Sequence, residues 1–443
     1  MTGRHAALRA RFSGGRGAAL TLVDQLISSA SNFALGVLIA RAGGTEGLGT
    51  FGIAFLIWLA VVGANRALVT EPMTVTKPIV GKQAQLPEGL LASLMLGLAA
   101  SVLLAAADFV LGLAHVDIVA LLALAPCIPS LLAHDYCRST AFRLQRPERA
   151  LISDIGFAVV QGVGSVTLLL LHVSSTAAFM AVWGLGASVG AAIGIVLNGI
   201  RPTPRGGVAL LRDLWPRSRW FLAEFGTAFP ADQGYLLLLP ILLGTGQFGL
   251  YRSGAGLIGP IVVILIAGGN VGLPEAVRRL RQHGMAGLAE YAQRLTAVIV
   301  AVTVLYCGGV AIFAEQVLRL TYGEEFTGAV TITRLIAGQY VLLALSFGFG
   351  QAAKAAGRMR QLWATRAVSA AISITALVVF VHVFGLVGAG LASMMAGAAY
   401  STGVIVAYRR IRNSHLPVPS TASDGATAEP ARAELSSRYP GQG

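Results

Sequence analysis

The sequence is poor in charged residues and in the motifs of soluble enzymes. Asp, Glu, Lys and Arg make up 12% of its 443 residues, about half the usual share in a soluble domain. It contains no P-loop, no HExxH motif and no GxSxG motif, which argues against ATP hydrolysis and against these hydrolase classes. The three cysteines, Cys127, Cys137 and Cys307, have no metal-type spacing and form no disulfide framework. We therefore expect neither an enzyme nor a bound metal or cofactor.

Apolar residues, in contrast, make up 55% of the chain, and the mean hydropathy is +0.71. This composition predicts an all-α polytopic membrane protein. Hydropathy and turn signals give about twelve spans, each near the roughly 20 residues that a bilayer requires. The predicted spans are 18–40, 50–69, 89–112, 117–135, 151–172, 176–198, 220–243, 248–273, 291–314, 331–353, 364–384 and 386–408.

The positive charges fall in alternate loops. A net charge of +13 would suggest a nucleic-acid partner for a soluble protein. Outside the spans, however, twenty-six Lys and Arg residues fall on one side of the membrane and two, Arg41 and Arg319, on the other. The positive-inside rule then predicts both termini in the cytoplasm and no nucleic-acid partner. The basic loops are also suited to anionic headgroups of membrane lipids.

The most informative stretch is a helical hairpin from Asp24 to Met73, with a Gly-rich turn at 41–49. Asp24, Ser28 and Asn32 recur every four residues and so share one face of its first helix. That face must look at protein or water, because lipid satisfies no polar group.

A shift of 200 residues places this hairpin on a second stretch of the chain. The acid, the polar stripe and the Gly-rich turn recur in register, although chance similarity is a rival explanation. The paired positions are Asp24 and Glu224, Asn32 and Asp232, Leu38 and Leu238, Gly44-Thr45 and Gly244-Thr245, Gly49 and Gly249, and Phe51 and Tyr251. Six spans in each half make this a parallel repeat, in which substrate binds between halves that rock against each other.

Ionisable residues inside the spans are candidates for function, since each is costly in lipid. Asp24, Glu224 and Asp154 lie near helix N-termini, where interaction with the helix dipole explains them equally well. Asp232 lies near the middle of its span, where a functional or ion-paired role is favoured.

The arginines of the spans divide in the same way. Arg252 and Arg334 lie one turn below the outer face and can snorkel to the interface, and Arg66 is intermediate. The nearby pair His134 and Asp135 is expected to be a solvated edge rather than a catalytic pair.

Together these residues predict a pathway for an anionic, sugar-bearing substrate exchanged against a cation. Arginines suit a pyrophosphate because the guanidinium fork binds it bidentately. Carboxylates suit coupling to H⁺ or Na⁺, and Asn, Gln and Ser suit sugar hydroxyls. The predicted pathway residues are Asp24, Asn32, Arg66, Glu224, Asp232, Arg252 and Arg334.

The hairpin VDQLISSASNFALGVLIARAGGTEGLGTFGIAF resembles the first two helices of polysaccharide (O-antigen type) flippases. These belong to the multidrug/oligosaccharidyl-lipid/polysaccharide (MOP) exporter superfamily. The segments Phe248 to Leu280 and Leu320 to Gln361 are similar to that family as well.

The resemblance implies two pseudo-symmetric six-helix bundles around a central cavity, in a bacterial cytoplasmic (inner) membrane. It also implies ion-coupled flipping of undecaprenyl-pyrophosphate-linked oligosaccharide, with polysaccharide polymerase machinery as a possible partner. The expected parts are a basic N-terminus at 1–17, bundles at 18–200 and 220–410, a basic linker at 201–219 and a disordered tail at 411–443.

Two other functions remain as alternatives. A multidrug cation antiporter of the same superfamily is expected to have an acidic, aromatic cavity, and the arginines in the spans count against it. A glycan polymerase or ligase usually needs a large outer loop, whereas the longest one here runs only from Glu315 to Val330.

Overall fold

The computed structural model describes residues 2–75, 85–113 and 119–413, and every regular element in these ranges is helical. Seven of the described helices are long and apolar enough to cross a membrane. The protein is therefore an all-α polytopic membrane protein, as the composition predicts. The predicted tail at 411–443 lies almost entirely outside the described residues, and so do the side chains of the basic N-terminus.

Three of the long helices each contain two predicted spans, which reverse direction at a single glycine. The three helices are α1 (Thr2–Asn65), α10 (Thr245–Ile312) and α14 (Met359–Asn413), and they turn at Gly44, Gly284 and Gly385. Gly385, at φ 55° and ψ −133°, separates the last two predicted spans with no further loop residues. A side chain would be strained in this backbone conformation, so glycine alone allows so abrupt a turn.

The other predicted spans are single helices or broken helices. Those formed by one helix are α3 (Leu86–Leu113), α6 (Pro147–Leu170) and α7 (Thr176–Asn198). The broken ones combine α4 (Val119–Leu124) with α5 (Ile128–Arg143), α8 (Gly207–Asp232) with α9 (Leu238–Leu243), and α12 (Val330–Ala344) with α13 (Phe347–Ala355). Short helices complete the described chain: η1 (Arg66–Thr70), α2 (Glu71–Val75), η3 (Ala125–Cys127), η4 (Gly234–Leu237), α11 (Ala314–Thr321) and η5 (Glu324–Ala329).

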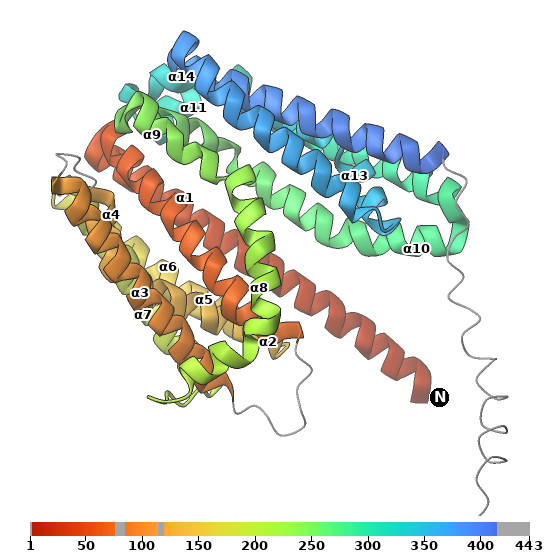
Figure 1. Cartoon of the computed structure of the whole chain (residues 1–443), viewed down its shortest axis with the longest axis horizontal. Coiled ribbons are helices and arrows are strands. Elements are labelled where there is room, and N and C mark those ends of the chain that lie inside the picture. Colours follow the sequence, from red (N-terminus) through yellow and green to blue (C-terminus); the bar gives the residue numbers. More distant parts are fainter. Residues whose placement is uncertain (1, 76–84, 114–118, 414–443) are drawn as a thin grey trace, which may run out of the picture.

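Figure 1 shows the helices in two groups, and we call them the N-group (α1 to α7) and the C-group (α9 to α14). Within the N-group α6 and α5 pack against α7, and within the C-group α12 and α13 pack against α10. The start of α1 and the end of α14 lie at the same end of the molecule (Figure 1). We call this the basic end, because it bears the arginine-rich loops, and we call the opposite end, with Gly44 and Gly244, the turn end.

The two groups touch at the turn end through a reciprocal glycine contact. A Cβ atom built on Gly49 would lie 1.9 Å from the carbonyl oxygen of Thr245, and one on Gly249 would lie 1.9 Å from that of Thr45. These four positions are pairs under the 200-residue shift. The structure therefore places the sequence repeat across a pseudo-two-fold contact, in which only the absence of a side chain lets the backbones meet.

Polar and aromatic contacts reinforce the junction at the turn end. The backbone N–H and hydroxyl of Thr45 donate to the Glu325 carboxylate at 3.1 and 2.8 Å. Arg41 donates to the carbonyl oxygens of Leu320 and Thr321, and the rings of Phe33 and Tyr322 meet edge to face at 6.2 Å. The Glu315 to Val330 segment is thus a clasp that the C-group places on the N-group.

Helix α8 joins the two groups. Its first half packs on the N-group, because Leu210 and Leu214 are buried there and the Ser218 hydroxyl donates to the carbonyl oxygen of Leu68 at 2.8 Å. Residues 207–219 are accordingly helical, although the sequence analysis expected a linker at 201–219. The placement of the boundary between the two bundles stays a prediction.

Candidate functional site

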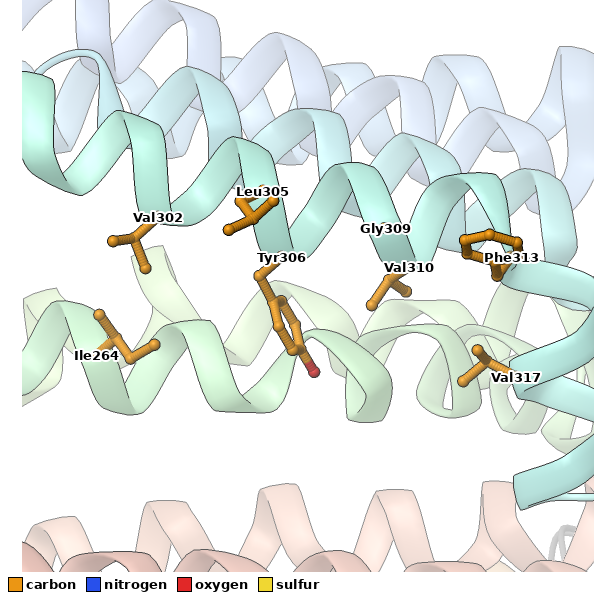
Figure 2. Close-up of a pocket in the computed structure, with 8 residues that line it drawn as sticks. All are labelled: Ile264, Val302, Leu305, Tyr306, Gly309, Val310, Phe313 and Val317. Atoms are coloured by element: carbon orange, nitrogen blue, oxygen red, sulfur yellow. The ribbon is translucent and has the colours of Figure 1, made fainter.

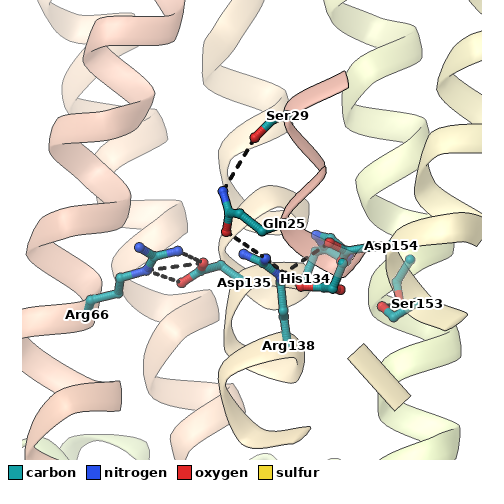
Figure 3. A network of polar contacts seen from close by, with 10 residues as sticks. Gln25, Ser29, Arg66, His134, Asp135, Arg138, Ser153 and Asp154 are labelled. Atoms are coloured by element: carbon teal, nitrogen blue, oxygen red, sulfur yellow. Dashed lines mark hydrogen bonds and ion pairs between the residues drawn. The ribbon is translucent and has the colours of Figure 1, made fainter. Parts of the chain in front are cut away.

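A network of charged side chains lies inside the N-group, near the basic end (Figure 3). Helix α5 supplies three of its members, His134, Asp135 and Arg138, over little more than one helical turn. His134 and Arg138 are four residues apart and share one face, while Asp135 is rotated away from them. One face of α5 therefore contacts two carboxylates of other helices, through His134 and Arg138. Another face contacts an arginine through Asp135.

Arg138 pairs with two buried carboxylates that come from different helices. Its Nη2 and Nε atoms lie 2.6 and 3.1 Å from Oδ2 of Asp24 in α1. The same Nε atom lies 3.2 Å from Oδ2 of Asp154 in α6. The side chains of Asp24 and Asp154 are only 0% and 2% exposed. One guanidinium thus holds two acids that would be very unfavourable if they were buried alone.

His134 extends this cluster. Its Nε2 atom lies 3.2 Å from Oδ1 of Asp154, and its ring stacks on Phe157 at a centroid distance of 5.0 Å. The expectation that His134 and Asp135 form a solvated edge is wrong, because both residues are buried. Hydropathy ends the fourth span at residue 135, but α5 continues to Arg143 and keeps both side chains inside the bundle.

The second arginine of the network is Arg66, which binds Asp135 bidentately. Its Nη2 lies 2.5 Å from Oδ1, and its Nε lies 3.1 Å from Oδ2. Arg66 opens a five-residue π-helical segment that follows α1, and such segments are frequent at functional sites. Asn65 just before it is 1% exposed, and its side-chain amide has no hydrogen-bond partner in the described part of the chain.

The network contains more carboxylates than guanidinium groups. Three carboxylates, Asp24, Asp135 and Asp154, face two guanidinium groups and one imidazole. The cluster is electrically balanced only when one further positive charge is present, either a proton on His134 or one of the acids, or a bound cation. Uptake and release of a single cation is therefore the chemistry that it supports.

A second cationic side chain, Arg252, lies between the N-group and the C-group. Arg252, in the first segment of α10, places its guanidinium 5.2 Å from the ring centroid of Phe55 in α1, and its alkyl chain lies beside Gly52. No carboxylate pairs with it among the described residues. Arg252 is one turn from the Gly249 contact, so it lies just inside the junction at the turn end.

An aromatic cluster of the N-group surrounds Phe55. Trp58 lies 5.3 Å and Trp183 6.3 Å from Phe55, between ring centroids. The indole N–H of Trp58 is buried and has no hydrogen-bond partner in the described structure. Arg252 therefore lies against an apolar, weakly solvated surface, where a cation attracts an anion more strongly than in water.

The remaining predicted pathway residues lie elsewhere. Asn32 is half-buried and its side-chain oxygen has no partner in the described chain, whereas Glu224 is exposed. Arg334 is exposed and donates to the carbonyl oxygen of Ala311 at 3.0 Å. Asp232 ends α8, where the seventh span breaks, but its side chain lies outside the described part of the structure.

Hydropathy and charge along the sequence do not identify the partners of the predicted acids. By its position Arg138 is one of the loop cations, yet its side chain is only 17% exposed and lies in the network. The available signal was the close spacing of His134, Asp135 and Arg138 at the end of an apolar span.

A hollow of about 520 Å³ lies between the two segments of α10 (Figure 2). Its walls include Ile264, Val302 and Phe313, and its one polar group is the Tyr306 hydroxyl. That hydroxyl already donates to the carbonyl oxygen of Leu257 at 2.7 Å. The hollow offers no free polar group to fix a charged substrate.

Comparison with known proteins identifies the fold. No family model and no curated protein matches the sequence. Among solved structures, an inward-facing multidrug resistance MATE family transporter of the MOP superfamily has a TM-score of 0.68 and 16% identity, over 89% of this chain and 98% of that one. The lipid II flippase MurJ, in an inward closed conformation, has a TM-score of 0.69 and 12% identity, over 89% of this chain and 90% of that one.

The chain has the fold of MOP-superfamily transporters. An outward-facing MATE family transporter is less similar, with a TM-score of 0.59 and 14% identity over 90% of this chain and 95% of that one. Identities this low establish the fold alone. In this fold Arg252 lies between the N-group and the C-group, and the charge network lies inside the N-group.

Proposed function

We propose that the protein flips undecaprenyl-pyrophosphate-linked oligosaccharide across the bacterial cytoplasmic membrane, with its basic end in the cytoplasm. The observation that supports this most directly is Arg252, a guanidinium between the two groups with no carboxylate partner in the described structure. A pyrophosphate supplies the paired oxygens that such a fork binds. A cationic drug, in contrast, would be repelled there.

Alternating access follows from the same geometry. The groups meet at the turn end through Gly49, Gly249 and the Glu325 clasp. A substrate would enter from the basic end, reach Arg252 near the junction, and leave after the junction opens. The higher TM-score to the inward-facing than to the outward-facing MATE structure supports an inward-facing state.

The charge network of the N-group supplies the coupling site in this proposal. Binding of H⁺ or Na⁺ would balance the third carboxylate and change how tightly Asp24 and Asp154 hold Arg138. Because Asp24 lies in the first segment of α1, which ends at the junction at Gly44 and Thr45, the network can act on that junction through the helix itself.

Flipping in proteoliposomes tests the role of Arg252. Replacing Arg252 with glutamine should lower the rate of flipping of the undecaprenyl-linked substrate at least about tenfold, the usual effect of losing hydrogen bonds to a charged group. Lysine should restore only part of the rate, because it lacks the planar fork. Arg319→Gln is the matched control, since Arg319 forms exposed ion pairs at the same end. Equal rates for Arg252→Gln and Arg319→Gln would contradict the proposal.

A cation antiporter is the second candidate, and the excess of acid in the network together with the Phe55, Trp58 and Trp183 cluster favours it. For an antiporter, efflux of a cationic dye should depend on a proton gradient and fall severalfold or more in Asp24→Asn. Dye efflux with this dependence, and no flipping of the lipid-linked substrate, would replace the first proposal by the second.

A further inference from the structure

A second pocket, of about 410 Å³, lies in the C-group between the first segment of α10 and α13. Ligand sites in proteins commonly have volumes of about 300–1,000 Å³. Most of the wall is apolar, and the remainder is formed by three polar side chains: Asn270, Gln351 and Lys354. The pocket begins ten residues after Arg252 in the same helix, toward the basic end, and it lies in the other group of helices from the charge network.

Among the described residues, none forms a hydrogen bond with the polar side chains of this pocket. Gln351 is only 7% exposed, and no described residue forms a hydrogen bond with its side-chain amide. It lies beside Gly269 and Gly272, where a Cβ atom would lie 3.5 and 3.6 Å from its side chain. Its side chain lines the pocket, so the amide is placed to donate a hydrogen bond to a ligand that enters there.

Lys354 adds a positive charge at the same place. It is exposed, and no carboxylate of the described chain acts on it, whereas Arg366 of α14 acts on it as a like charge. Two neighbouring cations repel each other and attract an anion. An ammonium and an amide at one mouth favour a phosphate over a neutral headgroup.

The polar and apolar parts of the pocket are arranged one after the other along the predicted membrane normal. Asn270 and Lys354 lie at the basic ends of their predicted spans, while Val262, Leu265 and Ile266 line the pocket toward the membrane interior. Eight helical residues separate Val262 from Asn270, a rise of about 12 Å. This order matches an amphiphile whose charged head lies at the interface and whose chain runs into the bilayer.

We propose that this pocket binds the phosphate headgroup of an anionic membrane lipid. Lys354, Asn270 and Gln351 donate to the phosphate oxygens, and the first part of the lipid chain lies along α10. Two kinds of lipid carry such a phosphate headgroup: a bulk phospholipid and a polyprenyl phosphate carrier. The site does not depend on the protein being a flippase.

Binding to the purified full chain tests the site, with undecaprenyl phosphate, phosphatidylglycerol and phosphatidylcholine as probes in native mass spectrometry and thermal-shift titration. Undecaprenyl phosphate or phosphatidylglycerol should bind saturably and phosphatidylcholine weakly. Lys354→Gln should weaken binding of the anionic lipid about tenfold or more, and Gln351→Leu severalfold. The control is Arg360→Gln, which removes the same charge from the same membrane side outside the pocket.

Two results would overturn the proposal: equal losses in Lys354→Gln and Arg360→Gln, which would show a diffuse surface charge effect, or the absence of saturable binding. A tenfold preference for undecaprenyl phosphate supports the site and identifies the carrier as its ligand, and equal affinities support the site and identify bulk phospholipid. Binding is measured without transport. A failure of flipping therefore does not affect the binding result, and a failure of binding does not contradict the proposed flipping.

Discussion

Replacing Arg138 with leucine should destabilise the protein by about 3–5 kcal/mol, the usual cost of breaking a buried ion pair by removing one partner. The reason is that Arg138 alone joins Asp24 to Asp154, and both carboxylates are almost completely buried. Without the guanidinium, two like charges face each other in a bundle that water hardly reaches. Thermal unfolding of the purified protein in detergent measures the effect.

The control is Arg146→Leu. Arg146 pairs with Glu148 at 3.7 Å, but both side chains are about half exposed, so this loss should change stability by no more than about 1 kcal/mol. If Arg138→Leu yields no folded protein, the triple variant Asp24→Asn, Arg138→Met and Asp154→Asn should recover much of the stability, since it leaves no unpaired charge. A single Arg138→Leu variant as stable as Arg146→Leu would show that the network is not buried as described.

The second large effect is expected at the contact between the two groups. Replacing Gly249 with alanine places a Cβ atom 1.9 Å from the carbonyl oxygen of Thr45, a separation at which one backbone must move. Overpacking of this kind typically costs about 1–3 kcal/mol, and here the cost falls only on the state in which the turn end is closed. The closed state should therefore lose population by about tenfold or more, and transport should fall with it.

Spin labels on Leu171→Cys and Ile312→Cys, both exposed positions near the turn end, measure the separation of the groups. Gly249→Ala should shift the distance distribution to longer values, and Gly49→Ala should do the same because the contact is reciprocal. The matched control is Gly259→Ala in the same helix, where a Cβ atom meets nothing within 4 Å. An unchanged distribution in Gly249→Ala would show that the contact does not hold the turn end closed.

The sequence by itself determined the class of the protein and the positions of its long apolar helices. Hydrophobic length alone predicts the spans, because a bilayer imposes a fixed thickness on each. Single glycines such as Gly385 mark the reversals, since few other residues adopt a positive φ. The 200-residue repeat was visible as pairs such as Gly49 and Gly249, although only the structure showed that these two glycines touch each other.

The tertiary structure decided which charges meet. Asp24 and Arg138 are 114 residues apart, and hydropathy holds no information about which face of a spanning helix is turned toward which neighbour. For the same reason Arg138 looked like a loop cation, and the sequence does not indicate that Gln351 and Lys354 line one pocket with Asn270. In lipid every spanning helix is apolar on most sides, so the usual amphipathic signal that orients a helix is weak. Packing between helices, and not the pattern along any one of them, fixes the positions of the few polar side chains.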